Sequence, residues 1–305
     1  MTAVRPLVYA KLLGAMFLWG GTWIAGRIIA QEVAAPLAAA ALRFLLAGLT
    51  LGMYAASTTE GWPAWPEGRQ WGTVVGLALT GITLYALCFF YGLRHLPAGR
   101  GALVVALNPA VAVLVAWFLG SERMTPIKAL GCLLALTGCL AVIGNGDPMA
   151  LLHGAIGPGE WLILGCVVCW TAYTFIGRLA TRSLSPLAAT LFASLLGGLF
   201  LGAIALIHGH LDLATWSWRV WASVAFLAIG GTALAFTWFA DGVKHLGAAR
   251  ASSFINLVPV FAVVQAALLL NEHLGLAVLV GGALVVAGVW LTNWNPRSSL
   301  LEKTA

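Results

Sequence analysis

The sequence is poor in charged residues. Only 9% of its 305 residues are Asp, Glu, Lys or Arg, and 61% are hydrophobic, whereas an average soluble domain carries about 25% charged residues. No water-soluble fold has an interior large enough to bury that apolar share. The composition therefore excludes a soluble protein and predicts one that is embedded in a lipid bilayer.

Blocks of consecutive basic residues are also missing. The net charge is +6, but Lys and Arg stand singly beside apolar segments and form no phosphate-binding patch. We therefore expect no nucleic acid partner. The basic residues are better interpreted as signals of membrane topology.

Motifs for catalysis and for metal or cofactor binding are absent. The sequence contains no H-E-x-x-H, no G-x-S-x-G and no Walker loop. His208 and His210 share one predicted loop, which is too little for a metal site. Cys166 and Cys169 form a C-x-x-C inside an apolar run, where packing is the expected role. We expect no metal, no cofactor and no enzymatic activity.

Carboxylates are lacking where a proton-coupled exporter of drug cations would need one. Such an exporter exchanges a proton for its substrate at an acidic side chain within the membrane. The acidic residues here lie at or near the ends of the apolar runs, and Asp241 is the deepest of them. Exchange of a cation for protons is therefore disfavoured.

What the sequence does contain is apolar runs, each long enough to cross a bilayer as a helix. They predict an all-α integral membrane fold with ten transmembrane helices. The predicted spans are Leu7–Ile29, Pro36–Ala56, Trp71–Leu93, Gly101–Leu119, Pro126–Gly144, Glu160–Ala180, Pro186–Ile207, Trp218–Gly242, Ala251–Leu270 and Leu274–Trp294.

The chain is also internally repeated. An offset of 150 residues aligns the two halves from the second span onward, and an offset of 151 aligns the first span with the sixth. This predicts two five-helix repeats, residues 1–147 and 158–296, and an odd number of spans makes the second inverted. Matching positions include Gly48 and Gly198, Gly81 and Gly231, Gly92 and Gly242, Pro109 and Pro259, Glu122 and Glu272, Trp19 and Trp170, and Arg27 and Arg178.

The distribution of basic residues predicts the orientation. With the N-terminus inside, eleven Lys and Arg residues fall on the inner side and five on the outer side. Basic residues favour the cytoplasmic side. We expect a multi-pass protein of a bacterial cell inner membrane with both termini in the cytoplasm.

Inverted-repeat transporters bind substrate near the bilayer midplane, where Gly or Pro interrupts corresponding spans of the two halves. Pro109 and Pro259 match this description and are predicted hinges, together with Gly81 and Gly231. Glycine on such a face also serves ordinary helix packing. Both interpretations stay open.

Aromatic and polar side chains near the middle of the spans are candidates for substrate binding. Tryptophan in this position suits an aromatic solute site, although packing or lipid contact is an alternative. Buried amides suit either substrate contact or bonds between helices. Arg43 suits a substrate carboxylate, or it extends to the membrane surface. The candidates are Trp19, Tyr85, Asn108, Trp170, Tyr173, Trp238, Asn256, Gln265 and Arg43.

Two glutamate-containing segments carry a resemblance to a known family. Residues 119–123 (LGSER) and 270–273 (LNEH), each followed by a glycine-containing span, are similar to the signature of EamA-type proteins of the drug/metabolite transporter superfamily. Trp19-Gly20 and Arg43-Phe44 resemble that family too. The resemblance implies a ten-helix pseudo-symmetric fold with a central cavity and with the fifth and tenth spans peripheral.

The resemblance implies export of amino acids and related metabolites, and the aromatic candidates make the chain most similar to exporters of aromatic and neutral amino acids. Ala193 stands where the first repeat has Arg43, so anion binding would be asymmetric. Transport of drugs or sugar derivatives is an alternative, and an intramembrane enzyme or a receptor is an alternative of a different class. The G-x-x-x-G segments at Gly48 and Gly198 leave monomer and homodimer undecided.

Overall fold

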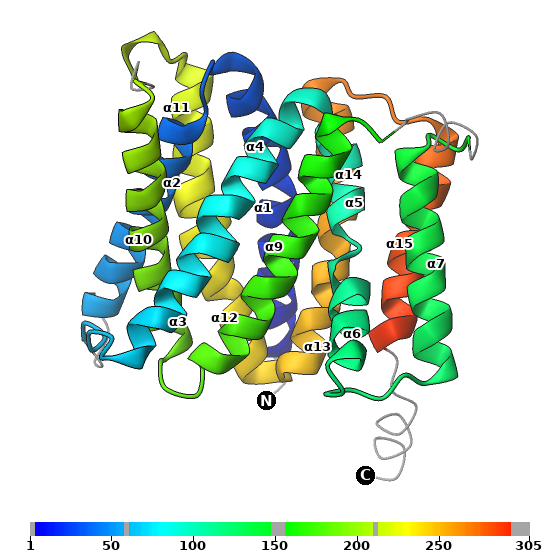
Figure 1. Cartoon of the computed structure of the whole chain (residues 1–305), viewed down its shortest axis with the longest axis horizontal. Coiled ribbons are helices and arrows are strands. Elements are labelled where there is room, and N and C mark those ends of the chain that lie inside the picture. The colour runs from blue at the N-terminus through cyan, green and yellow to red at the C-terminus, as the bar shows by residue number, and fades with distance from the viewer. Residues whose placement is uncertain (1–3, 58–60, 148–155, 210–212, 294–305) are drawn as a thin grey trace.

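The structure is a computed structural model that describes residues 4–57, 61–147, 156–209 and 213–293 (Figure 1). Every regular element within these ranges is helical. Nine apolar helical stretches have 18 or more residues, and a shorter tenth one covers Leu276–Thr292. This confirms the all-α membrane fold with ten spans. Trp294 and the rest of the predicted second repeat up to residue 296 lie outside the described residues.

The first five spans follow the predicted order. Pro126 begins the last of them, and Thr125 caps it by accepting a hydrogen bond from the Lys128 backbone N–H at 3.3 Å. The elements are α1 (Val4–Glu32), α2 (Leu37–Ser57), α3 (Arg69–Leu77), the π-helix η1 (Ala78–Leu84), α4 (Tyr85–His95), α5 (Ala98–Val105), α6 (Asn108–Phe118) and α7 (Pro126–Ile143).

The second five spans repeat this pattern. Ser185 caps the seventh span as Thr125 caps the fifth, with Pro186 at its first turn. The elements are α9 (Pro158–Ala180), α10 (Pro186–Ile207), the short η2 (Leu213–Thr215), α11 (Trp218–Ala225), the π-helix η3 (Phe226–Leu234), α12 (Ala235–Leu246), α13 (Ala248–Ser253), the 3₁₀ turn η4 (Phe254–Leu257), α14 (Val258–Leu270) and α15 (Leu276–Asn293).

Close contacts at glycines establish the inverted two-repeat arrangement. A Cβ atom on Gly81 would lie 2.1 Å from the Tyr173 ring, and one on Gly231 would lie 2.6 Å from Thr22. Thr22 and Tyr173 are themselves repeat mates at the 151-residue offset. Each repeat therefore packs its first span on the third span of the other repeat, at glycines that let the helices approach.

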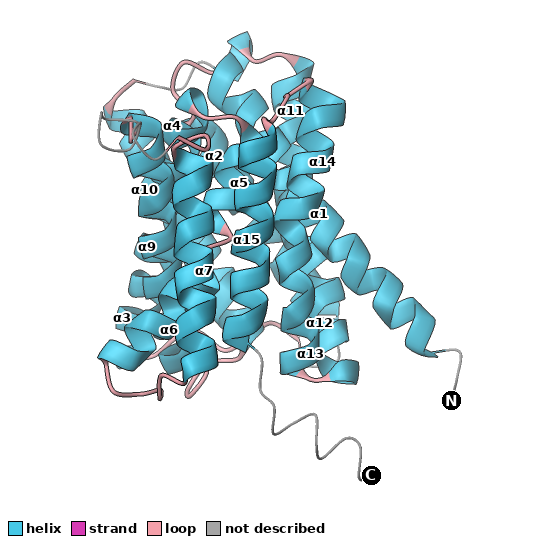
Figure 2. Cartoon of the chain, turned by 90° about the vertical axis from the view of Figure 1, so that its right-hand side faces the viewer, coloured by secondary structure: helices cyan, strands magenta, loops and turns pink. Residues whose placement is uncertain are grey.

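The G-x-x-x-G segments are used within the chain. A Cβ on Gly48 would lie 2.5 Å from Leu195, and one on Gly198 would lie 2.9 Å from Leu45, because α2 packs directly on α10. The fifth and tenth spans form a second symmetric pair, in which Gly131 of α7 faces the main chain of Gly288 of α15. These two helices stand together at one side of the molecule (Figures 1 and 2).

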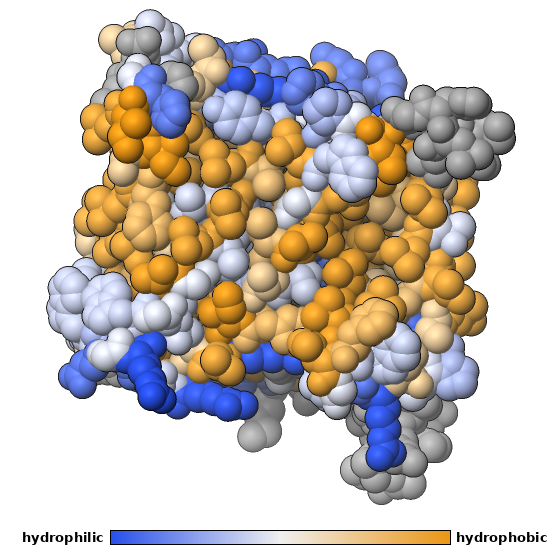
Figure 3. Space-filling view, in the orientation of Figure 1, coloured by the Kyte–Doolittle hydropathy of each residue, from blue (hydrophilic) through white to orange (hydrophobic). Residues whose placement is uncertain are grey.

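The surface matches a protein that spans a bilayer. On the face shown in Figure 3, hydrophobic side chains form a broad band across the middle, and hydrophilic ones gather at the two ends. The N-terminal end of α1 and the C-terminal end of α15 lie at the same end of the bundle (Figure 1). We call this the Glu122 end and the opposite one the Glu272 end, after the glutamates that follow α6 and α14.

Candidate functional site

Three predicted binding residues form one aromatic group between α4 and α9. The rings of Trp170 and Tyr173 stack with centroids 5.2 Å apart, and Tyr85 lies 5.8 Å from Trp170. Phe89, which the sequence did not single out, stacks on Tyr85 at 6.0 Å. Trp170 leaves 38% of its surface exposed, so this group has a free face for an apolar or aromatic moiety.

Arg43 lies close to this aromatic group. Its guanidinium stands 4.5 Å from the centre of the Phe44 ring and within electrostatic range of the Tyr85 hydroxyl. The Nε atom is buried and has no hydrogen-bond partner. A buried donor without a partner costs about 1–3 kcal/mol, which makes this N–H a group that a bound anion would satisfy.

Trp19 and Trp238 belong to a different cluster, between α1 and α12. The indole N–H of Trp19 donates to the main-chain oxygen of Gly231 at 3.0 Å, and its ring packs on Phe236 and Phe239. Trp238 covers Gly14, where a Cβ would lie 2.6 Å from its ring. These two tryptophans hold helices together and do not join Trp170.

The three predicted amides have different environments. Gln265 is buried, donates to the Phe17 oxygen at 3.0 Å and packs against Gly20. Asn256 is half-buried in the η4 turn. Asn108 begins α6, and its Oδ1 atom is buried without a hydrogen-bond partner. Only Gln265 therefore has a defined structural bond, between α14 and α1.

The predicted hinge positions coincide with irregular backbone. The fourth span is interrupted between α5 and α6, directly before Asn108 and Pro109, and the ninth contains the 3₁₀ turn η4 before Pro259. Proline removes a main-chain donor and disfavours a continuous helix. Gly81 and Gly231 lie inside π-helices, which are often found at functional sites.

The thiols lie beside the aromatic group. Cys166 and Cys169 of α9 contact Cys88 of α4 through their sulfur atoms, and all five cysteines are free. No group of three or more His, Cys, Asp or Glu side chains among the described residues is arranged to hold a metal ion.

A polar cluster at the Glu272 end was not predicted from the sequence as a functional site. Glu272 accepts hydrogen bonds from the backbone N–H groups of Ala98 and Gly99 at 2.8 and 3.1 Å, and Arg27 stands 4.0 Å away. A polar hollow of about 310 Å³ adjoins it. The signal that marked it was the repetition of both charges, Glu122 with Glu272 and Arg27 with Arg178.

Comparison with known proteins gives matches along the whole chain. The transporter YyaM of Bacillus subtilis, described as uncharacterized, is 28% identical over 283 residues, which cover 92% of each chain. A probable terminal-alkyne amino-acid exporter of Streptantibioticus cattleyicolor is 29% identical over 230 residues, 75% of each chain. A WAT1-related chloroplastic protein of Arabidopsis thaliana is 28% identical over 301 residues, which cover 94% of this chain and 70% of that one.

A solved crystal structure shares the fold, with a TM-score of 0.64 at 22% identity over 94% of this chain and 97% of that one. The model of the EamA-like transporter family matches twice, at residues 7–144 and 157–294. Two copies of the family unit agree with the two structural repeats. This chain is a multi-pass membrane protein that belongs to the EamA-like transporter family.

Proposed function

We propose that this chain is a secondary transporter that exports neutral and aromatic amino acids, such as threonine, methionine, phenylalanine and tryptophan, or related small metabolites. The observation that carries the proposal is the aromatic group of Tyr85, Trp170 and Tyr173 beside the unbonded Nε–H of Arg43. Aromatic rings suit an apolar side chain, and a guanidinium suits a carboxylate. An amino acid carries both.

One relative supports an outward-moving carrier. It is a probable terminal-alkyne amino-acid exporter, whose name indicates a solute with an apolar side chain. In this chain, alternating access would come from movement of the two inverted repeats about a midplane site. The paired interruptions before Pro109 and Pro259 are the proposed hinges.

We propose the bacterial inner membrane as the location, with both termini in the cytoplasm. The support is the excess of Lys and Arg on the side that holds the N-terminus. Single cysteines at Arg123 and His95, which lie exposed at opposite ends, test this in a variant without native cysteines. A membrane-impermeant thiol reagent added to whole cells should label His95→Cys and spare Arg123→Cys. The reverse pattern would invert the topology.

The experiment that tests the transport function is counterflow of labelled threonine, methionine, phenylalanine and tryptophan in proteoliposomes. We expect the wild type to exchange at least one of them and Trp170→Ala to lose that exchange. Trp161→Ala is the matched control on the same helix, because Trp161 is 62% exposed near the helix end. If the wild type exchanges none of the four with or without a pH gradient, the amino-acid proposal fails, and drugs and sugar derivatives are tested next.

The role of Arg43 is tested by its dependence on the carboxylate. Arg43→Gln removes the charge, so we expect it to weaken exchange of an amino acid while sparing exchange of the corresponding amide, which lacks the carboxylate. Equal loss for both solutes would show that Arg43 supports the protein without contacting the solute.

A further inference from the structure

Six of the ten spans form two bundles, and each bundle combines both repeats. The first bundle contains α9 packed on α3, η1, α4, α5 and α6. The second bundle contains α1 packed on α11, η3, α12, η4 and α14. Each bundle therefore joins the first span of one repeat to the third and fourth spans of the other.

The two bundles contact each other at the Glu272 end, where α1 packs on α4 and α5, and α14 packs on α5. The repeat symmetry maps these contacts onto α9 with α12 and α13, and α6 with α13, at the Glu122 end. None of those symmetric pairs makes a comparable contact within the described residues. Within the described residues, the two bundles therefore meet at the Glu272 end and stay apart at the Glu122 end.

Three charged side chains link the bundles at the closed end. Glu272 of the second bundle accepts the backbone N–H groups at the start of α5, at 2.8 and 3.1 Å. Arg27 donates to the main-chain oxygen of Leu93 in α4. Arg94 of α4 donates to the main-chain oxygens of Ala30, Val33 and Ala34, the second of these at 2.7 Å.

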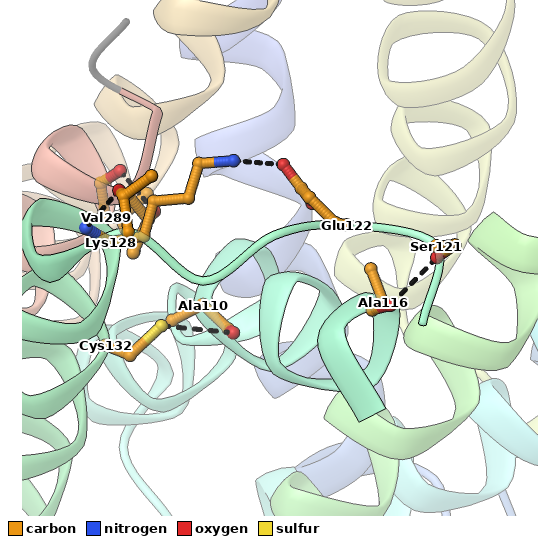
Figure 4. A network of polar contacts seen from close by, with 9 residues as sticks. Ala110, Ala116, Ser121, Glu122, Lys128, Cys132 and Val289 are labelled. Carbon is orange, nitrogen blue, oxygen red and sulfur yellow. Dashed lines mark hydrogen bonds and ion pairs between the residues drawn. The ribbon is translucent and has the colours of Figure 1, made fainter. Parts of the chain in front are cut away.

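The symmetry mates of these three residues keep their charges but make other contacts. Glu122 pairs with Lys128 of its own repeat (Figure 4), and its side chain is 38% exposed, against 12% for Glu272. Arg178 is exposed over the ring of Phe175 at 5.3 Å. Lys244, at the position that matches Arg94, is exposed. The two repeats carry the same charge at these three equivalent positions, but only one set of side chains links the bundles. This indicates that the other set can form equivalent links in a different conformation.

The two glutamates share one main-chain hydrogen bond. The backbone N–H of Glu122 donates to the Ala116 oxygen at 3.2 Å, and that of Glu272 donates to the Ala266 oxygen at 3.2 Å. Ala116 and Ala266 are mates at the 150-residue offset. The two glutamates thus share this main-chain bond but differ in their side-chain partners, the start of α5 for Glu272 and Lys128 for Glu122.

We infer that Glu122 and Glu272 are alternating latches of the transport cycle. Closing the Glu122 end brings Glu122 to the backbone N–H groups at the start of α13, Arg178 to the main-chain end of α12, and Lys244 to the end of α9. In the same step Glu272 leaves α5, and Lys128 holds Glu122 only in the present state. The inference rests on the proposed transport function and assigns the residues that exchange during it.

Apart from the contact of His245 with Asp241 inside α12, the described residues form one further ion pair at the Glu122 end, and it fits this scheme. Lys11 and Asp241 approach to 2.7 Å, but they join α1 to α12 inside the second bundle. Gln70 and Ser183, 3.1 Å apart, join α3 to the end of α9 inside the first bundle. Neither contact has to break when the bundles move against each other.

The test measures distances between spin labels by pulsed electron resonance, in a variant whose five native cysteines are replaced by alanine. One pair, His95→Cys with His273→Cys, spans the bundles at the Glu272 end. The mated pair, His245→Cys with Arg123→Cys, spans them at the Glu122 end. All four positions are exposed, and they are repeat mates of one another.

Glu272→Gln should raise the population with a long His95–His273 distance and a short His245–Arg123 distance about tenfold, because it loses charge-assisted hydrogen bonds. Lys128→Gln should shift the distances in the same direction, since it frees Glu122 without touching the closed end. Glu122→Gln should lower that population. Glu67→Gln is the control, because this exposed glutamate at the Glu122 end forms no ion pair with a described residue.

Unchanged distances in both Glu272→Gln and Lys128→Gln, or a shift in the direction of Glu122→Gln, would overturn the inference. The measurement needs no transported solute, so its failure is distinct from failure of the proposed function. If the distances shift as expected while no amino acid is exchanged, the result supports the alternating latches and contradicts the proposed substrate.

Discussion

Trp19 of α1 donates its indole N–H to the main-chain oxygen of Gly231 at 3.0 Å, and Gly231 lies in the π-helix η3 of the other repeat. The hydrogen bond joins the first span to the eighth at mid-span. Thr232, the next residue, bonds its hydroxyl to the Leu227 oxygen five residues back at 2.9 Å. The side-chain and main-chain groups of this segment thus fix the π register together.

Trp19→Phe should therefore destabilise the fold while keeping most of the ring packing. We expect a loss of about 1–2 kcal/mol in the free energy of unfolding, because a hydrogen bond to a main-chain acceptor is removed. Unfolding in mixed detergent micelles measures it. Trp161→Phe, at a 62% exposed position, should change stability little, and equal losses in the two variants would contradict the role of the bond.

Gly81→Ala should also destabilise the protein. An added Cβ would lie 2.1 Å from Cδ2 of Tyr173, in the interface of η1 with α9, and overpacking a tight contact costs about 1–3 kcal/mol. Gly177→Ala is the control on α9, because no atom outside its local helix lies within 4 Å of the position of its Cβ. The same unfolding assay applies. An unchanged free energy of unfolding in Gly81→Ala would show that the interface of η1 with α9 can adjust to the added methyl group.

Asn108 and Gln265 should respond in opposite ways to replacement by leucine. Asn108 Oδ1 is buried without a partner, so Asn108→Leu should retain or raise stability, by up to about 1–3 kcal/mol. If Asn108 contacts the solute, the same variant loses exchange. Gln265 is bonded to the Phe17 oxygen, so Gln265→Leu should lower stability. A stable Asn108→Leu variant with wild-type exchange would remove Asn108 from the site.

The prolines that follow the interruptions should affect the rate of exchange more than solute binding. Pro109→Ala and Pro259→Ala restore a main-chain donor and favour a continuous helix, which should slow exchange several-fold with a similar solute affinity. Pro186→Ala is the control, because the residue before it, Ser185, is extended and no preceding helical segment could be joined to α10. Exchange rates and equilibrium binding separate the two effects, and an equal slowing in the control would exclude a specific hinge role.

The sequence predicted most of the fold correctly because span length and repeat register are local properties. The predicted second span, Pro36–Ala56, and the observed α2, Leu37–Ser57, agree within one residue at each end. The fourth span was predicted at Gly101–Leu119 with an interruption at Pro109, and the helix breaks directly before Asn108. The π-helices were not predicted, since hydropathy does not distinguish one helical hydrogen-bond register from another.

The sequence identified the candidate site residues by their type, and tertiary packing decided which of them lie together. Trp19 and Trp170 are mates with the same residue in the same place of each repeat. Trp170 joins Tyr85 and Tyr173, whereas Trp19 packs on Phe236 and Phe239. Cys88 stands where the second repeat has Trp238, so the two neighbourhoods differ in side-chain volume and only one tryptophan keeps a free face.

By itself, the sequence determined the number of spans, the duplication and the inverted arrangement of the repeats, because bilayer thickness and an odd helix count leave little choice. The tertiary structure alone decided which end is closed. Glu122 and Glu272 are repeat mates that share one main-chain hydrogen bond, and local sequence does not show which of them reaches the other bundle. The physical difference is the approach of the two bundles, which gives Glu272 the start of α5 as its partner and leaves Glu122 with Lys128.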